Sequence, residues 1–419
     1  FLIMGRDLCP LLNCIVLSTF LLLFQLALIQ TNFVIDSLKK VYPDKEFTIV
    51  TMTTLGDRIL NVSLPKIGEK SLFTKDLEDA LRNKTVDFVV HSLKDLPTTL
   101  PEGLAVGAVF EREDPRDALV LRDDLKDCTL ATLPSGSVIG TSSLRRTAQL
   151  RGAHPHLSVV DVRGNLNTRL RKLDSAQDYS ALLLATAGLE RMGWAHRISK
   201  ILPCSEMMYA VGQGALAVEC CADNDVILSM LAPFNHPETY CRVLAERSFL
   251  KTLGGGCSAP VGVSTKLKPF NSQFKLSITG GVWSLEGDVR IDHTLDETFP
   301  QITKSQKHKL SPTEESEAKK LKVDGENGNG SKSDNLIEEY NRRISEKQGI
   351  LNCEDLDVDP KEIATYCGLT ANLSVPIDVI IKCDNLGKDL ANALISKGAL
   401  DVMKVSQDTI RSSTVAKKS

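Results

Sequence analysis

The sequence predicts two α/β domains followed by an α+β domain. Three observations lead to this fold class. Apolar runs with strand character alternate with helical patterns in two successive series, as in domains built on parallel sheets. A charged passage at residues 111–117 (EREDPRD) separates the two series and is interpreted as a crossing between domains. Beyond His236 the alternation stops, and two strands with a tight turn between them indicate a hairpin.

The composition limits the kind of protein. The chain has 419 residues, 42% hydrophobic and 25% charged, which suits two or three domains with sizeable cores. A net charge of -3 gives no general attraction to nucleic acid, so any anion site must come from local clustering. The 11 cysteines are scattered without a CxxC pair, so they indicate neither a zinc ribbon nor a disulfide framework and favour a reducing compartment.

The N-terminal stretch 11–29 (LLNCIVLSTFLLLFQLALI) is uncharged and nearly long enough to span a bilayer. Arg6 and Asp7 precede it, as in a signal peptide or an anchor, but four polar residues interrupt it. Hydropathy alone leaves the membrane interpretation open.

The first series begins with apolar residues three and four apart, which predict a helix from Leu26 to Val41, ending before Pro43. The elements expected after it are a strand at 47–52, a helix at 74–82, a buried strand at 86–93 and a strand at 105–110. The second series contains strands at 137–140, 157–162 and 179–185, and helices at 144–151, 165–173 and 188–194.

The third part begins with a helix at 242–253, which three glycines end. A hairpin follows, with strands at 274–285 and 288–295 and a turn at Glu286-Gly287. The stretch from about Gln301 to Asn335 is polar and lacks aromatic residues, and a disordered insertion is expected at about 301–360. Order returns near Ile363, and residues 386–403 predict a closing amphipathic helix.

Two polar groups follow the buried strand at 86–93. Ligands bind beyond the carboxyl ends of strands in open α/β sheets, which places Lys94 and Asp95 well. This pair could hold a carboxylate and supply a charged group for acid–base work. A solvated ion pair at a strand end is the alternative.

Arginines follow the next two strands. Thr141-Ser142-Ser143-Leu144-Arg145-Arg146 opens a helix with two cations, which oppose the helix dipole unless an anion sits there. The stretch 162–171 repeats the arrangement with Arg163, Gly164 and Arg169. The planar guanidinium suits carboxylates, so we predict an anion site. A solvated basic face or an RNA-binding helix are alternatives, but no aromatic residues are interleaved as RNA binding prefers.

Two further stretches are weaker signals. Gly212 and Gly214 flank Gln213, a donor and acceptor, in a passage that returns the chain to the first domain; a simple turn is the alternative. Cys257 lies in the loop Gly254-Gly255-Gly256-Cys257-Ser258, where a thiolate could act as a nucleophile or attachment point. A small buried thiol beside a helix end is the alternative.

Six stretches together resemble the porphobilinogen deaminase family: KIGEKSLFTKDLE at 66–78, VHSLKDLP at 90–97, GTSSLRR at 140–146, VRGNLNTRLRKL at 162–173, YAVGQGAL at 209–216 and the GGGCS loop. The resemblance runs from about Leu26 to Leu295 and resumes near Ile363. It implies two domains like type II periplasmic binding proteins and a C-terminal α+β domain with a three-stranded antiparallel sheet.

The resemblance also implies an activity: four porphobilinogen molecules condense into the linear tetrapyrrole hydroxymethylbilane with release of ammonia, in heme biosynthesis. A dipyrromethane cofactor would hang from Cys257 by a thioether, and Asp95 would be the catalytic carboxylate. The side chains or backbone expected to bind cofactor and substrate are Lys94, Thr141, Ser142, Ser143, Arg145, Arg146, Arg163, Gly164, Arg169, Gln213 and Gly214. The family further implies a cytoplasmic monomer with no metal and no nucleic-acid partner.

The expected domains are residues 24–112 with 212–235, then 113–211, then 236–419, after an atypical N-terminus at 1–23. Here the sequence departs from the family, because Leu22 and Phe24 stand where an arginine and a serine are expected. The first strand is therefore expected to be missing. This leaves a catalytically impaired variant, or a carboxylate-binding protein on the same scaffold, as alternative functions.

Overall fold

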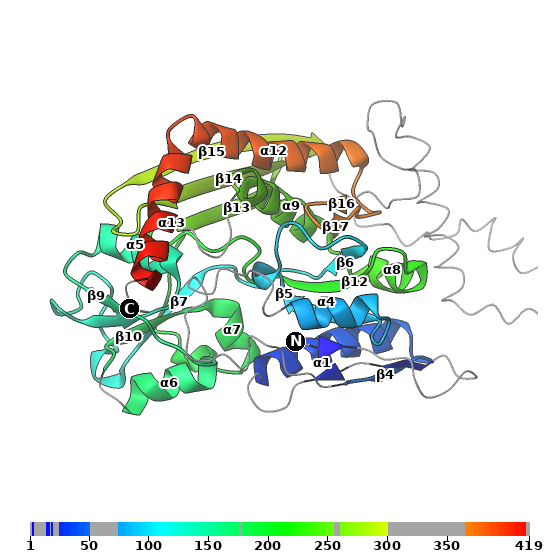
Figure 1. Cartoon of the computed structure of the whole chain (residues 1–419), viewed down its shortest axis with the longest axis horizontal. Coiled ribbons are helices and arrows are strands. Elements are labelled where there is room, and N and C mark those ends of the chain that lie inside the picture. The colour runs from blue at the N-terminus through cyan, green and yellow to red at the C-terminus, as the bar shows by residue number, and fades with distance from the viewer. Residues whose placement is uncertain are drawn as a thin grey trace, which may run out of the picture.

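The structure is a computed structural model that describes residues 2–3, 14–16, 18–19, 25–50, 74–175, 178–254, 260–300 and 365–415. It contains two lobes, each with a five-stranded sheet, and a third unit with a three-stranded sheet. In Figure 1 the first lobe lies on the right, the second on the left, and the third unit above both. The predicted fold class is confirmed.

The first lobe is built on a mixed sheet of short, buried strands. Their order in space is β16 (Thr365–Tyr366), β17 (Leu369–Thr370), β6 (Leu104–Val109), β12 (Leu216–Cys221) and β5 (Phe88–Ser92). The helices of this lobe are α1 (Gln25–Val41), α4 (Lys75–Arg82) and α8 (Asp225–Leu231). The predicted helices at 26–41 and 74–82 and strands at 86–93 and 105–110 are thus confirmed to within a few residues.

The second lobe has a sheet of the same kind. Its order in space is β11 (Lys200–Ile201), β7 (Asp117–Leu121), β10 (Ala181–Ala185), β8 (Val138–Gly140) and β9 (Ser158–Val160). Its helices are α5 (Leu144–Ala153), α6 (Leu166–Ser175) and α7 (Thr186–Arg191). All six predicted elements of this series are present.

Both sheets share one feature that the sequence did not predict. The strand that enters directly after each crossing between the lobes, β7 in one and β12 in the other, lies inside the sheet and runs antiparallel to both of its neighbours. Every residue of both strands is buried. A short apolar run of this kind does not by itself distinguish a strand from a segment of a buried helix, and neither strand was predicted.

The third unit, called here the C-terminal unit, packs helices on a meander (Figure 1). Its strands are β13 (Val261–Phe270), β14 (Gln273–Trp283) and β15 (Arg290–Pro300), all antiparallel. The predicted turn is confirmed at Gly287, whose φ is +79°. The helix α9 (Pro237–Thr252) begins five residues before the predicted 242.

The predicted closing helix at 386–403 is wrong in its extent. Two helices occupy this part of the chain, α12 (Ile377–Ile395) and α13 (Ala399–Val415). Gly398 between them has a φ of +90°, a conformation that ends a helix and that glycine adopts without a steric penalty. The predicted insertion at about 301–360 lies outside the described residues.

Short elements complete the described chain. Single turns of 3-10 helix lie at Leu93–Asp95, Asp123–Leu125, Ala195–Arg197 and Ala232–Phe234. Near the N-terminus, β1 (Leu2–Ile3) pairs with β3 (Ser18–Thr19), and β2 (Cys14–Val16) pairs in parallel with β4 (Glu46–Thr48). A strand therefore precedes α1, although the sequence predicted none, but the β2–β4 pair is separate from the five-stranded sheet. No helix within the described ranges is long and apolar enough to cross a membrane.

Candidate active site

The first half of the site lies at the carboxyl end of β5. Ser92 ends this strand, and the next turn carries Lys94 and Asp95, as predicted. Asp95 is exposed and Lys94 is partly buried. Burial lowers the pKa of Lys94; its neighbour Asp95 opposes this shift, while Arg146 and Arg145 add to it. Those arginines belong to the second lobe, so the Lys94–Asp95 motif and the arginine motif are close enough for their charges to interact.

The second half of the site lies at the N-terminus of α5. Arg145 and Arg146 occupy its first turn, and both are buried. Instead of lying free on the surface, both donate to one carboxylate: Arg145 Nη1 lies 2.7 Å from Asp117 Oδ2, and Arg146 Nη2 lies 2.7 Å from Asp117 Oδ1. The predicted cationic pair is therefore present, but half of its charge is already neutralised by the protein.

Asp117 was not predicted as a site residue. It is the first residue of β7 and is fully buried. Burial by itself would raise its pKa, but Arg145 and Arg146 outweigh this effect and hold the pKa well below its usual range. The sequence offered one signal, a charged residue at the start of an apolar run, but nothing that identified its partners 28 and 29 residues later.

Each arginine of the pair keeps one buried donor unused. Arg145 Nη1 also donates to Met208 O, and Arg146 Nη1 donates to Leu183 O at 2.8 Å. Within the described part of the chain, neither Arg145 Nε nor Arg146 Nε has a hydrogen-bond partner. A buried unpaired donor of this kind is costly, so these two groups fit a site that an anionic ligand completes.

The second arginine motif lies beside the first. Burial lowers the pKa of Arg169, and the charge of Arg146 lowers it further. Arg169 Nε donates to Gly164 O at 2.8 Å, where Gly164 takes a φ of +107°. Arg163 instead forms an ion pair with Asp161 at 2.6 Å. Arg169 thus joins the cationic group, whereas Arg163 is held by a neighbouring carboxylate.

The hydroxyls between β8 and α5 are used mainly to shape the loop. Thr141 Oγ1 accepts from Ser143 N at 3.2 Å, and the hydroxyl of Ser142 donates to Val162 O. The second contact joins the ends of the two strands that carry the arginine motifs. In the described structure these two hydroxyls hydrogen-bond to the protein backbone and so stabilise the loop beside the arginines.

Gln213 reaches the same buried carboxylate from the returning segment. Its Nε2 lies 2.8 Å from Asp117 Oδ1 and 2.7 Å from Pro115 O. Gly214 has a φ of +87°, and a Cβ there would lie 2.8 Å from Glu113 O, so the two crossing segments touch at this point. The predicted return of the chain to the first lobe is confirmed, because β12 follows directly.

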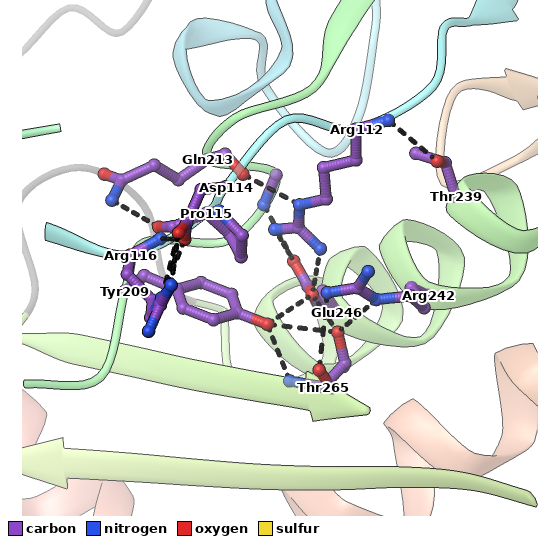
Figure 2. A network of polar contacts seen from close by, with 11 residues as sticks. Arg112, Asp114, Pro115, Arg116, Tyr209, Gln213, Thr239, Arg242, Glu246 and Thr265 are labelled. Carbon is purple, nitrogen blue, oxygen red and sulfur yellow. Dashed lines mark hydrogen bonds and ion pairs between the residues drawn. The ribbon is translucent and has the colours of Figure 1, made fainter. Parts of the chain in front are cut away.

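A buried ion pair fastens both crossings to the C-terminal unit (Figure 2). Arg112, in the first crossing, donates to both oxygens of Glu246 in α9, at 2.6 and 2.9 Å. Glu246 also accepts from Gly212 N, in the second crossing, and from Thr265 Oγ1 in β13. The sequence singled out the charged passage at 111–117 but gave no sign of this partner 134 residues later.

The loop that carries the cysteine predicted to attach the cofactor lies outside the described residues. Cys257 lies in residues 255–259, outside the described ranges, as does most of the motif at 66–78. The helix before it is described: α9 ends at Thr252, and Gly254 takes a φ of +64°, as predicted for a glycine that ends a helix. α9 therefore runs from the Glu246 ion pair to the start of the cysteine loop.

Family models and named relatives match this chain. The family model described as "Porphobilinogen deaminase, dipyromethane cofactor binding domain" matches residues 23–229, and that of the C-terminal domain matches 240–309. The porphobilinogen deaminase of Nostoc sp. is 54% identical over 271 residues, which cover 65% of this chain and 82% of the relative. That of Synechococcus elongatus is 56% identical over 263 residues, covering 63% and 81%.

Solved structures match more distantly. The periplasmic VFT2 domain of Bordetella pertussis BvgS matches over 48% of this chain and 74% of its own, with 15% identity and a TM-score of 0.29, a likeness too small to bear on function. The sequence relatives do not support the alternative of a non-catalytic carboxylate binder, because they carry the name of an enzyme. The chain belongs to the porphobilinogen deaminase family, whose enzymes hold a dipyrromethane cofactor and polymerise porphobilinogen into a linear tetrapyrrole in porphyrin biosynthesis.

Proposed function

We propose that this chain is a hydroxymethylbilane synthase whose active site lies between Lys94–Asp95 of the first lobe and the arginines of the second. The observation that carries the proposal is the group of cations at this place. Burial and the charge of Arg146 lower the pKa of Lys94, Arg145 and Arg169, and among the described residues two buried guanidinium Nε groups lack a partner. A substrate that carries an acetate and a propionate supplies the anions that such a site requires.

Each addition joins the aminomethyl carbon of one porphobilinogen to the free α-carbon of the last pyrrole ring. The C–N bond to the amine breaks, the α-carbon loses a proton, and ammonia leaves. Asp95, exposed at the end of β5, is the group we assign to stabilise positive charge on the pyrrole nitrogen and to assist the proton transfers. Lys94 and the arginines bind the carboxylates and so orient the reacting ring.

The residues present fit the dipyrromethane cofactor of the family. When bound, it supplies the pyrrole α-carbon to which the first substrate is joined. We assign its thioether attachment to Cys257 and its carboxylates to Arg145, Arg146 and Arg169, with Lys94, Gln213 and the loop Thr141-Ser142-Ser143 alongside. The unpaired Arg145 Nε and Arg146 Nε are the observation that supports this assignment. Arg163 and the backbone of Gly164 and Gly214 complete the proposed site.

Finer features of the protein belong to the same proposal. We assign residues 24–112 and 212–235 to the first domain, 113–211 to the second and 236–419 to the third. We also propose a cytoplasmic monomer that acts on porphobilinogen and uses no metal or nucleic acid. Size-exclusion chromatography with light scattering tests the oligomeric state.

Intact-mass spectrometry tests the proposal directly. The purified chain should carry an excess equal to two substrate-derived pyrrole units, and Cys257→Ser should lack it. The chain should also release four ammonia molecules per tetrapyrrole formed. Cys241→Ser, which changes a buried cysteine away from the loop, should keep the excess mass and serves as the control. A bare-chain mass together with no tetrapyrrole would overturn the proposed function.

A further inference from the structure

Asp117 is the point on which three residues of the proposed site converge. Its side chain is 0% exposed and accepts from Arg145, Arg146 and Gln213 at 2.7, 2.7 and 2.8 Å. No other carboxylate in the described ranges accepts from either of these two arginines. The chemistry of the reaction assigns Asp117 no role, because it lies beneath the arginines and is closed off from solvent.

The backbone of Asp117 is fixed more firmly than that of a loop residue. It opens β7, faces Ala185 in the neighbouring strand β10, and its carbonyl accepts from Leu202 N at 2.8 Å. A carboxylate on such a strand has little freedom to follow the motion of a ligand. Asp117 therefore holds the side chains that donate to it in fixed positions.

The two guanidinium groups are held by their terminal nitrogens. Arg145 is held through Nη1 by Asp117 and Met208 O, and Arg146 through Nη1 and Nη2 by Leu183 O and Asp117. In both, the Nε donor is buried and has no partner among the described residues. Two positive charges on one carboxylate leave one positive charge for a ligand.

We propose that Asp117 is a positioning residue: it fixes Arg145 and Arg146 so that their unpaired donors and surplus charge meet a carboxylate of the cofactor or substrate. This inference rests on the proposed function. It deepens that function by naming the group that preorganises the site. Preorganised donors bind more strongly because they need no rearrangement when the ligand arrives.

A rival role for the same carboxylate makes the opposite prediction. If Asp117 instead competed with ligand carboxylates for the arginines, its removal would free both guanidiniums and tighten substrate binding. If Asp117 positions the arginines, its removal weakens binding. The direction of the change in KM therefore separates the two roles.

The experiment compares Asp117→Asn and Asp117→Glu with the unaltered enzyme. Asp117→Asn removes the charge and one of two acceptors, and Asp117→Glu keeps the charge but shifts it by one methylene. We expect KM for porphobilinogen to rise about tenfold or more in Asp117→Asn, the size of one lost charge-assisted hydrogen bond, and less in Asp117→Glu, with kcat falling less than KM rises. The cofactor content is read from the intact mass.

The control is Asp174→Asn, which removes an aspartate that pairs with Arg197 at 2.6 Å on the surface of the second lobe. It should leave KM and cofactor content unchanged. If Asp117→Asn does not fold, as its melting curve would reveal, Asp117→Glu decides, since it retains the buried charge.

An unchanged or lowered KM in the folded variants overturns the positioning role while wild-type turnover remains. Absence of wild-type turnover under the same assay instead overturns the proposed function, so the two failures are distinguishable. Loss of stability with an unchanged KM would mean that Asp117 is only structural.

Discussion

Lys94 and Asp95 are adjacent in the chain but have different surroundings. Asp95 is exposed at the end of β5, whereas Lys94 is partly buried and lies close enough to Arg145 and Arg146 for their charges to affect it. A lysine in this position holds an anion only while it is protonated. The proposed roles of the two neighbours therefore differ: we assign Asp95 to the charge on the reacting ring, and Lys94 to a substrate carboxylate that it holds only while protonated.

Asp95→Ala should fold normally and lose nearly all turnover. The side chain is exposed and forms no hydrogen bond or ion pair within the described part of the chain, so its removal leaves no buried group unpaired. Tetrapyrrole formation should fall by a factor of about a hundred or more, as expected when a group acting in the transition state is removed. Turnover within twofold of wild type, at an equal melting temperature, would falsify the catalytic assignment.

Lys94→Arg should change the alkaline side of the pH profile. Burial and the two arginines lower the pKa of Lys94, so its charge and the affinity it gives should disappear at a pH below the usual value of about 10.4 for lysine. Arginine keeps its charge throughout this range. We compare kcat/KM of the variant with that of wild type, because their ratio cancels the titration of the substrate itself. This ratio should rise between pH 8 and about 10. A ratio that is flat with pH would contradict this role for Lys94.

At the scale of elements, the joint between α9 and α12 is unusually close. A Cβ added at Gly387 in α12 would lie 2.2 Å from the carbonyl oxygen of Ala245 and 2.8 Å from Phe249 N, both in α9. The two helices therefore touch backbone to backbone. α9 also contains Glu246 and ends just before the cysteine loop, so this joint holds the helix that connects the crossings between the lobes with the proposed cofactor attachment.

Gly387→Ala should destabilise the protein although alanine favours helices. Helix propensity alone would stabilise it by about 1 kcal/mol, but the clash with α9 should outweigh this and lower the free energy of unfolding by about 1 to 3 kcal/mol. Urea unfolding measures the change. Gly188→Ala in α7 is the control, because its nearest neighbour is a flexible leucine side chain at 3.3 Å. Equal effects of the two substitutions would show that the close approach does not matter.

At the scale of the whole molecule, the first lobe and the C-terminal unit share one hydrophobic core. Buried residues of the first sheet, among them Leu93, Val106 and Ala217, belong to the same cluster as those of α9, α12 and the meander. The strands β16 and β17, which follow the long polar segment, extend the first sheet. The second lobe has its own cores on the two faces of its sheet. It is joined to the rest mainly through the crossings and a small cluster of Ala148, Met208 and Trp283.

Glu246, which joins the crossings between the lobes to the C-terminal unit, should make the free energy of unfolding fall at acidic pH. Burial would raise its pKa, but Arg112 outweighs burial and lowers it. A carboxylate with a depressed folded-state pKa contributes stability above its unfolded-state pKa, about 4.3, and this contribution is lost as the pH falls toward the folded-state value. Glu246→Gln should cost about 3 to 5 kcal/mol at pH 7, since Arg112 stays buried without its partner.

Melting temperatures measured from pH 7 down to about pH 3 test this expectation. Wild type should lose stability steeply below about pH 4.3, and Glu246→Gln should start lower and decline less. Asp174→Asn, which removes an exposed ion-pair partner, should follow wild type. Parallel curves for wild type and Glu246→Gln would exclude Glu246 as a source of the acid dependence.

The sequence by itself determined what depends on neighbouring residues. Helical spacing predicted α1, α4, α5 and α6, glycine marked the end of α9 and the turn at Gly287, and the position of polar residues after strands located Lys94, Asp95 and the arginine motifs. The family followed from the order of these motifs. Each of these signals lies within a few residues of the feature it predicts.

Only the tertiary structure decided which charges meet. Asp117, 28 residues before Arg145, neutralises half of the charge of the arginine pair. Glu246, 134 residues after Arg112, ties the first crossing between the lobes to α9. The fully buried strands β7 and β12 were not predicted, and pairing with strands distant in the chain places both inside their sheets. A buried charge requires a partner, but the fold, not the sequence spacing, brings that partner within 3 Å, because it joins strands and helices from distant parts of the chain.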